Sequence, residues 1–390
     1  MKQNISIISH DNCFGCLGCY HICPVKAIDV QPDDKGFLYP FLNQVKCVGC
    51  GKCISLCPAL HSYTKDDGVF QQKFYAYQYN DSTERKKSKS GGAFWGLANK
   101  VVSDGGVVYG VALAKDFRVK HIRVDNRDQL DELRGSKYVQ SEMSEVYSKI
   151  CQDIKADKKI LVSGTSCQIH ALRLYLKAKN VNAKKIIFCD LVCHGVPSPK
   201  VFKEYVALLQ KRYKKKIKRF YFRSKTPFGW GNEREFVEFE NGEAVITTKY
   251  NQLDYYMLVY RHEMIRQSCF DCPFCNFNRV GDISLADFWG GEKKYPNLGN
   301  DPSGVSLVII NSLKGSTLFS GLDNSKVLEV SRDDCIQPNL MHPSSKSSDT
   351  DIYWEHFINY GIRKLLKLDS PAFKHRLKFL IKKILKRCNR

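Results

Sequence analysis

Between residues 73 and 315, short apolar runs alternate with longer amphipathic segments, a pattern that predicts strands alternating with helices. Consecutive strand–loop–helix units usually place their strands side by side and parallel. The loops 164–168 and 193–197 should then share one edge of a sheet, which is the usual place for a ligand. The expected strands are 74–79, 107–113, 158–163 and 185–192, and the expected helices are 93–102, 169–177 and one that begins at Ser198-Pro199, an N-cap followed by a first-turn proline.

The flanking segments have other patterns. The turn sequence Asp33-Asp34-Lys35-Gly36 separates two short apolar runs, 28–30 and 37–39, and predicts a hairpin. Residues 216–260 predict antiparallel strands, with alternation over 234–239 and a turn at Asn241-Gly242. Polar composition predicts a linker over 63–72 and a loop over 80–89, and the chain is expected to be helical and basic from about Ser344.

These patterns predict an α+β protein of several units. A small βαββαβ module is expected over residues 1–63, followed by a mixed α/β core and a basic helical tail over 344–390. Because 390 residues exceed the usual size of one domain, the chain is expected to form two or three units.

Two copies of one cysteine pattern, Cys-x-x-Cys-x-x-Cys-x-x-x-Cys-Pro, lie in the N-terminal module 34 residues apart. This is the bacterial-type spacing for a pair of [4Fe–4S] clusters, in which the fourth cysteine of each run ligates the other cluster. Zinc prefers sets built from Cys-x-x-Cys pairs, and a disulfide framework is typical of secreted chains, so neither alternative explains the repeat. The expected ligands are Cys13, Cys16, Cys19 and Cys57 for one cluster and Cys47, Cys50, Cys53 and Cys23 for the other.

A third constellation, Cys269-x-x-Cys272-Pro273-x-Cys275, has no local fourth ligand. Cys167 and Cys193 lie in the two loops expected at the sheet edge, so these five cysteines are candidates for a third [4Fe–4S] site. Two alternatives remain open: zinc bound with Cys193 or His194, and a redox-active Cys167 thiolate whose pKa is lowered at a helix N-terminus.

The other cysteines carry no such pattern. Cys189 lies within an expected strand and is interpreted as a core residue. Cys151, Cys335 and Cys388 have no partner pattern.

The net charge of +21 is concentrated in Lys211–Arg219 and after Pro371. Nucleic-acid binding would suit such charge, but no known nucleic-acid-binding motif accompanies it, so no nucleic-acid partner is expected. The first run is interpreted as a solvated helix end that leads into a strand, with docking of an acidic redox partner as the alternative. Residues 371–390 combine an apolar side with many lysines and arginines, which fits a helix on anionic lipid or a terminal helix packed on the core.

The N-terminus has no apolar signal region, and no stretch approaches the roughly 18 apolar residues of a membrane span. Thiolate-rich cluster sites need a reducing compartment. A cytoplasmic location is therefore expected, with peripheral contact at the inner face of the membrane through 371–390 as an option.

Five stretches together resemble the family of coenzyme F420 hydrogenase/dehydrogenase beta subunits: Ser90–Phe94, Arg134–Tyr138, Gly164–Ile169, Cys193–Ser198, and Cys269–Cys275 with Asp282–Gly290. The resemblance covers about residues 1–315 and is closest to a branch with an N-terminal two-cluster ferredoxin domain, often associated with polysaccharide biosynthesis. It implies that residues 73–180 resemble the N-terminal domain of these beta subunits and that residues 181–343 resemble their C-terminal domain. Ser166 and Ala286 depart from the family pattern, which usually has proline and glycine there.

The resemblance implies a core that binds FAD and exchanges electrons with it through an iron–sulfur cluster; F420 itself is a further candidate cofactor. A Gly-Gly sequence that opens a helix suits a pyrophosphate, Lys137 suits a phosphate or the flavin N1 charge, and Tyr138 suits stacking on a ring. The residues implied for the cofactor are Ser90, Gly91, Gly92, Gly135, Ser136, Lys137, Tyr138, Gly164 and Thr165.

The expected function is that of an iron–sulfur flavoprotein oxidoreductase, an enzyme whose catalytic residues the sequence does not identify. Electrons from a ferredoxin-like donor protein would pass through [4Fe–4S] clusters to FAD and then to a small organic substrate or cofactor, within polysaccharide biosynthesis. The alternative is a non-catalytic electron-transfer subunit that serves a separate enzyme.

Overall fold

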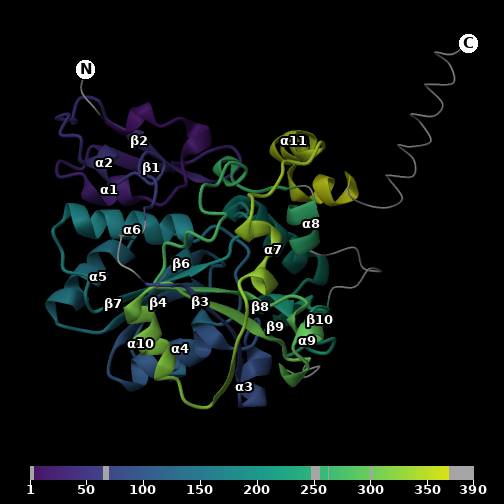
Figure 1. Ribbon diagram of the computed structural model, residues 1–390. Helices are drawn as coiled ribbons and strands as arrows, with labels where there is room; N and C mark the ends of the chain where they lie inside the picture. The colour runs from purple at the N-terminus through teal and green to yellow at the C-terminus, as the bar shows by residue number, and fades with distance from the viewer. Residues whose placement is uncertain (1–3, 65–69, 247–254, 262, 299–301, 369–390) are drawn as a thin grey trace, which may run out of the picture.

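The computed structural model describes residues 4–64, 70–246, 255–261, 263–298 and 302–368 (Figure 1). The predicted tail helix over 371–390 and Cys388 lie outside these residues. No helix in the described ranges is long and apolar enough to cross a membrane.

An eight-stranded mixed sheet forms the centre of the molecule, in the order β13-β3-β12-β11-β7-β6-β4-β5. Four neighbouring strands, β11, β7, β6 and β4, are parallel, and the outer pairs are antiparallel. The predicted parallel pairing of the strands near 160 and 186 is confirmed, because Ile160 pairs with Ile186 and Thr165 with Leu191. The strands are β3 (Lys73–Tyr79), β4 (Val107–Leu113), β5 (Val119–Val124), β6 (Ile160–Thr165), β7 (Ile186–Leu191), β11 (Ile283–Asp287), β12 (Ser306–Ile310) and β13 (Ser325–Glu329).

Strands from the two predicted beta-subunit segments lie in one sheet. Strand β3, from the first predicted domain, lies between β12 and β13, from the second. The segments 73–180 and 181–343 therefore share one sheet, since the backbone hydrogen bonds of β3 are completed by strands more than 200 residues later in the chain.

Helices cover both faces of this sheet (Figure 1). Helices α5 (Val146–Lys155) and α6 (Ser166–Ala178) pack on one face, and α4 (Ala93–Ser103) and α10 (Leu313–Ser320) pack on the other. Side chains of a strand point alternately to the two faces, so Val162 of β6 joins the core under α5 and α6 while Leu161 joins the core under α4. Burial on both faces explains why the parallel strands read as continuous apolar runs in the sequence.

The N-terminal module contains the predicted hairpin and two short helices, and it packs on α5 and α6 (Figure 1). The hairpin consists of β1 (Ile28–Pro32) and β2 (Leu38–Leu42), and the helices are α1 (Gly18–Ile22) and α2 (Lys52–Ser55). Of the four strands expected in a βαββαβ module, the described residues form these central two, and a 3₁₀ turn over Ile5–Ile7 precedes the first cysteine run.

A smaller antiparallel sheet packs with three helices beside the main sheet. It contains β8 (Ile217–Ser224), β9 (Arg234–Phe239) and β10 (Ala244–Ile246), and the helices are α7 (Pro199–Tyr213), α8 (Tyr255–Arg261) and α11 (Thr350–Leu368). The predicted N-cap of α7 is confirmed, because Ser198 Oγ accepts hydrogen bonds from the backbone N–H groups of Lys200 and Val201. The predicted helix end that leads into a strand after Lys211 is also confirmed.

Two helices replace a predicted loop and a predicted strand. Helix α3 (Ser82–Lys87) lies in the expected loop and begins because the Asp81 carboxylate caps its first turn. Helix α8 lies in a segment that was predicted as strand, and several of its apolar side chains are buried. The remaining helical segments are α9 (Gly291–Lys294), η1 (Ile5–Ile7), η2 (His10–Asn12), η3 (Asp128–Leu133), η4 (Gln267–Cys269), η5 (Pro296–Leu298), η6 (Asp333–Cys335) and η7 (Pro338–Leu340).

Candidate functional site

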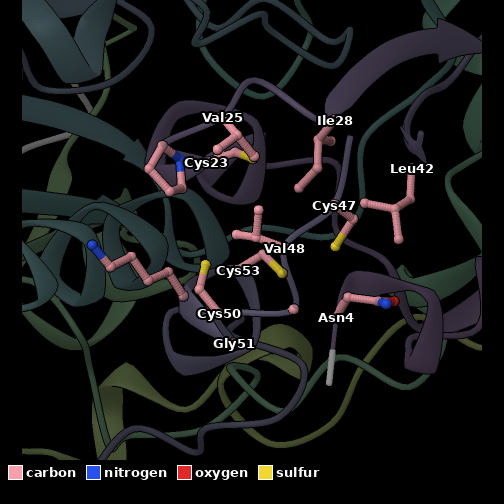
Figure 2. Close-up of a pocket in the computed structure, with 13 residues that line it drawn as sticks. Asn4, Cys23, Val25, Ile28, Leu42, Cys47, Val48, Cys50, Gly51 and Cys53 are labelled. Carbon is pink, nitrogen blue, oxygen red and sulfur yellow. The ribbon is translucent and has the colours of Figure 1, made fainter. Parts of the chain in front are cut away.

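The outermost cysteine set lines one cavity in the N-terminal module (Figure 2). Three of its cysteines come from the second run and one, Cys23, comes from the first, as the spacing predicts; the set is Cys23, Cys47, Cys50 and Cys53. Burial, together with the charges of Cys50 and Cys23, raises the pKa of Cys53, so these thiols lie within electrostatic range of one another. The rest of the wall is largely apolar, and Cys50 is exposed to solvent. We call this set the outer site.

The second predicted set, Cys13, Cys16, Cys19 and Cys57, gathers beneath the first and is called the inner site. Burial and then the charges of Cys16, Cys13, Cys57 and Cys53 raise the pKa of Cys19. Burial, with smaller contributions from Cys13 and Cys53, raises the pKa of Cys57 to about 11. The fold therefore brings together the two sets of four with their fourth cysteines exchanged.

The five remaining candidates form a third group at the carboxyl end of the parallel strands, here called the core site. Cys167 lies in the first turn of α6, Cys193 follows β7, and the triad Cys269, Cys272 and Cys275 lies between α8 and β11. Burial and the charges of Cys167 and Cys272 raise the pKa of Cys193 to about 12. Burial raises the pKa of Cys269, with repulsion first from Cys193 and then from Cys167 and Cys272. The triad therefore lies close to Cys167 and Cys193, the two cysteines predicted at the sheet edge.

The structure around Cys167 differs from the sequence prediction in where the helix begins. The helix begins at Ser166, not at Ile169, because Thr165 and Gln168 form a capping box at its N-terminus. Burial raises the pKa of Cys167 to about 11, which opposes the thiolate form that the helix dipole would favour. Desolvation of the thiolate outweighs the dipole here.

The other cysteines lie apart from the three sites. Cys189 is fully buried in β7, as predicted, and Cys335 is buried in an apolar cluster with residues of β3 and β12. In the described ranges, no three or more His, Cys, Asp or Glu side chains are arranged to hold a single metal ion, including at the triad for which zinc was the alternative.

Arg279 fixes the triad to the sheet edge. Its side chain is almost fully buried, and its Nη2 atom forms an ion pair of 2.6 Å with Asp190 of β7. The same Nη2 donates to Ser166 Oγ at 2.8 Å, while Nη1 donates to the Phe274 carbonyl at 2.8 Å. One guanidinium thus joins the loop of Cys272 and Cys275, the strand before Cys193 and the helix of Cys167.

Arg266 fixes the N-terminal module to the core. This residue is 0% exposed, and its Nε donates to the Cys13 carbonyl at 2.6 Å. Its Nη1 donates to Gln140 Oε1 at 3.0 Å and its Nη2 donates to the Leu38 carbonyl at 3.1 Å. The Arg266 backbone N–H donates to Val196, three residues after Cys193. Arg266 therefore touches the inner-site loop while its own segment leads directly into the triad.

The three sites follow one another in space. The charge of Cys53 in the outer site contributes to the raised pKa of Cys19, after burial and the inner-site cysteines. Burial dominates the raised pKa of Cys16, to which the charges of Cys57, Cys13 and then core-site Cys167 also contribute. Outer, inner and core sites therefore lie in that order, each within electrostatic range of the next.

An aromatic group borders the core site. Tyr260 and His194 have ring centroids 4.4 Å apart, and Tyr138 lies 4.8 Å from Tyr256. Burial and then the charge of Cys193 raise the pKa of Tyr260, so this group adjoins the core site. Burial lowers the pKa of His194 to about 4, which keeps its imidazole neutral at physiological pH.

A set of buried charges lies beyond these rings. Glu233, whose side chain is fully buried, pairs with Arg223 at 2.7 Å and with Lys89. Lys89 also lies 3.5 Å from Asp287, and the Arg223 guanidinium lies 4.5 Å from the Tyr256 ring centroid. Sequence analysis missed this set because its members come from three distant segments of the chain and match no motif.

Two tryptophans lie next to these charges. Trp230 and Trp289 stack with centroids 4.7 Å apart and an interplanar angle of 1°, and Lys89 lies 5.8 Å from the Trp289 ring centroid. The Nε1 atom of Trp230 is buried without a hydrogen-bond partner in the described structure.

Comparison with known proteins assigns both parts of the chain. Residues 12–60 match the family described as "4Fe-4S dicluster domain", and residues 157–334 match the family described as the C terminus of the beta subunit of coenzyme F420 hydrogenase/dehydrogenase. The chain therefore combines an N-terminal 4Fe-4S dicluster domain with a segment similar to the C terminus of the coenzyme F420 hydrogenase/dehydrogenase beta subunit. The predicted family resemblance is thereby confirmed.

Two curated proteins and one solved structure are similar to this chain. One subunit of the F(420)H(2) dehydrogenase of Methanosarcina mazei is 22% identical over 305 residues, which cover 73% of this chain and 79% of that protein. An uncharacterized polyferredoxin-like protein of Methanocaldococcus jannaschii is 33% identical over 61 residues, 14% of this chain and 36% of that protein. A chain of the xenon-derivatised F420-reducing [NiFe] hydrogenase complex from Methanosarcina barkeri aligns with a TM-score of 0.44 and 17% identity, covering 78% of this chain and 94% of that chain.

Ser90, Gly91 and Gly92 precede the segment that matches the beta-subunit family, and they pack tightly against the sheet. Ser90 Oγ donates to the Val305 carbonyl, and the Gly91 carbonyl accepts from Tyr79 N–H at 2.8 Å. A Cβ on Gly91 would lie 2.1 Å from the Tyr77 carbonyl oxygen, so only glycine fits. These contacts account for the conformation of the loop without a ligand. Its role in binding a pyrophosphate stays a prediction.

The remaining predicted cofactor residues lie in two places. Gly135 and Ser136 are at the exposed end of η3, and Lys137 Nζ donates to the Glu132 and Arg134 carbonyls at 2.9 and 2.7 Å. Burial lowers the pKa of Lys137 to about 7. Gly164 and Thr165 end β6, where the Thr165 hydroxyl lies 3.2 Å from Cys167 Sγ. Among the predicted cofactor residues, Tyr138 alone belongs to the aromatic group.

Replacing Arg266 with glutamine is expected to destabilise the protein by about 3 kcal/mol or more, because three backbone and side-chain acceptors lose a buried charged donor. Chemical denaturation of the purified protein measures this change. Arg219→Gln is the control, since that side chain is 61% exposed and its loss should cost about 0.5 kcal/mol or less. Equal stability of the two variants would show that Arg266 does not hold the module in place.

Iron–sulfur reconstitution of cluster-free protein is expected to improve as the pH rises from neutral. The pKa values of Cys57 and Cys167 are raised to about 11 and that of Cys193 to about 12, so these thiols are protonated near pH 7 and must release their protons to ligate iron. Each pH unit below the thiol pKa adds about 1.4 kcal/mol per thiol to the cost of ligation. Iron and sulfide uptake at constant ionic strength measures the effect; uptake that is constant or falls with pH would contradict it.

Proposed function

We propose that this chain is an iron–sulfur flavoprotein oxidoreductase in which electrons enter at the outer site and travel through the inner and core sites to FAD. The observation that carries the proposal is the continuous order of three cysteine groups that ends at an aromatic group beside Cys193. The family matches support the iron–sulfur and beta-subunit parts of this description. The ligand assignment follows the three groups, with four of the five core-site cysteines ligating the third [4Fe–4S] cluster.

The residues beyond the core site suit a flavin. Tyr138, Tyr256 and Tyr260 offer ring faces and edges, which favour stacking with a planar ring. Arg223 and Lys89 are cations held in place by Glu233, so they are pre-organised for anionic groups. FAD bound there would accept electrons one at a time and pass two on together.

The protein's own residues supply orientation and exclusion of water. Glu233 and Asp287 balance the cations Arg223 and Lys89 in the absence of an anion, which keeps buried charge paired. His194 stays neutral, so it offers a hydrogen-bond donor and an acceptor next to the rings without adding charge.

The further parts of the proposal concern partners and setting. The donor is a ferredoxin-like protein and the acceptor is a small organic substrate, within polysaccharide biosynthesis, or F420. The protein works in the cytoplasm, with residues 371–390 available for contact with the membrane surface. Support for the F420 option comes from the M. mazei relative, which is named as part of an F(420)H(2) dehydrogenase.

A second candidate function is a non-catalytic subunit that passes electrons to a separate enzyme. It is supported by the same M. mazei relative, because that protein is named as one subunit of a larger dehydrogenase.

Anaerobic purification is expected to yield bound flavin together with about twelve irons, the content of three cubane clusters.

Replacing Tyr256 with leucine should weaken flavin binding about tenfold because a ring contact is lost, while iron content stays unchanged. Quenching of flavin fluorescence on binding measures the affinity, and Tyr221→Leu, at an exposed tyrosine of β8, is the matched control. About eight irons without flavin would contradict the reductase and leave the electron-transfer subunit.

A further inference from the structure

The loop around the outer site exposes several apolar side chains. Val45 is 97% exposed, Val48 is 59% exposed and Val25 is 41% exposed. Val25 and Val48 line the same cavity as the outer-site cysteines, and Val45 lies two residues before Cys47 (Figure 2). Exposed apolar side chains that cluster around one opening are a feature of interaction surfaces.

Three lysines flank these valines. Lys26 follows Val25, Lys46 follows Val45, and Lys52 lines the cavity itself. All three are exposed, and none has an ion-pair partner among the residues that the structure describes. One exposed acid, Asp29, lies nearby on β1, so the local balance is positive.

The three cysteine groups differ in their access to solvent. The exposed member is Cys50 of the outer site, whereas Cys16, Cys19, Cys57 and Cys275 are buried and most other members are half-buried. Because electron transfer slows steeply with distance, a protein donor must bring its own redox centre close to the open site. The exposed valines and lysines surround that site.

We propose that the surface formed by Val25, Lys26, Val45, Lys46, Val48 and Lys52, here called the docking face, binds a small acidic one-electron carrier protein of the ferredoxin type. The proposal rests on the proposed function and names where its donor binds. Lysines without an ion-pair partner in the described structure steer an acidic carrier by long-range attraction, and the valines are desolvated at the centre of the contact. In each encounter the carrier is oxidised by one electron, the outer site is reduced by one, and no proton or group moves.

The experiment uses the full-length, cluster-loaded protein and a purified acidic [2Fe–2S] ferredoxin, reduced beforehand. Stopped-flow absorbance follows cluster reduction, and the second-order rate constant is measured from low to high ionic strength. The test variant reverses the docking-face charges (Lys26→Glu, Lys46→Glu and Lys52→Glu). The matched control reverses three exposed lysines of the other basic run that also lack ion-pair partners in the described ranges (Lys211→Glu, Lys214→Glu and Lys216→Glu).

The rate constant of the unmodified protein should fall as salt is added, and the docking-face variant should be about tenfold slower at low salt with a weak salt dependence. The control variant should stay within about twofold of the unmodified protein. Equal slowing of both variants, or none in the docking-face variant, would overturn the proposal. Dithionite, a small reductant, should reduce all three proteins equally; absence of reducible clusters in the unmodified protein would instead count against the proposed function.

A second variant separates the apolar centre from the charge. Val45→Ser and Val48→Ser together keep every charge, and both positions are exposed, so the fold should tolerate them. They should weaken complex formation with the ferredoxin at high salt, where steering is screened. An unchanged affinity at high salt would show that the valines take no part in docking.

Discussion

A buried guanidinium that meets no carboxylate among the described residues holds this molecule together. Arg266 is 0% exposed, and its hydrogen-bond acceptors in the described structure are carbonyl oxygens of Cys13 and Leu38 and the amide of Gln140. Burying an unpaired charge is expensive unless other charges compensate it. Arg266 lowers the pKa of Cys167, although the larger effect of burial raises it. The position of Arg266 therefore fits a protein whose surrounding thiols carry negative charge when they bind iron.

This constraint fixes the order and environment of the three cysteine sites. Arg266 holds the inner-site loop, and Arg279 holds the triad against β7 and α6. The outer site includes the exposed Cys50, whereas the inner-site cysteines are buried or half-buried and so are those of the core site. Reduction potentials of iron–sulfur clusters depend on solvent exposure and nearby charge, so one protein can give three similar sites different potentials. A buried cation beside the inner and core sites favours their reduced forms, which suits electron flow inward.

The sequence predicted the parts of the site that depend on local spacing. The two cysteine runs, the hairpin between them and the strands β6 and β7 follow from patterns within a few residues, and strand topology was enough to place Cys167 and Cys193 beside the triad. The start of α6 was available too, because Thr165 and Gln168 have the spacing of a capping box. The insertion of β3 between β12 and β13, and the meeting of Lys89, Arg223, Glu233 and Asp287, depend on contacts between segments up to about 250 residues apart, and no local pattern encodes them.

The proposed function requires that electrons reach a bound flavin by way of the exposed outer site. The most direct measurement compares flavin reduction by a reduced ferredoxin in the unmodified protein and in Cys50→Ala, under anaerobic stopped-flow conditions. Cys50 is the exposed cysteine of the outer site, so its loss should disrupt that cluster and leave the buried sites in place. The account predicts that iron–sulfur bleaching precedes flavin reduction in the unmodified protein, and that flavin reduction becomes at least about a hundredfold slower in the variant although its flavin content is normal. Flavin reduction at the same rate in both proteins would contradict the account.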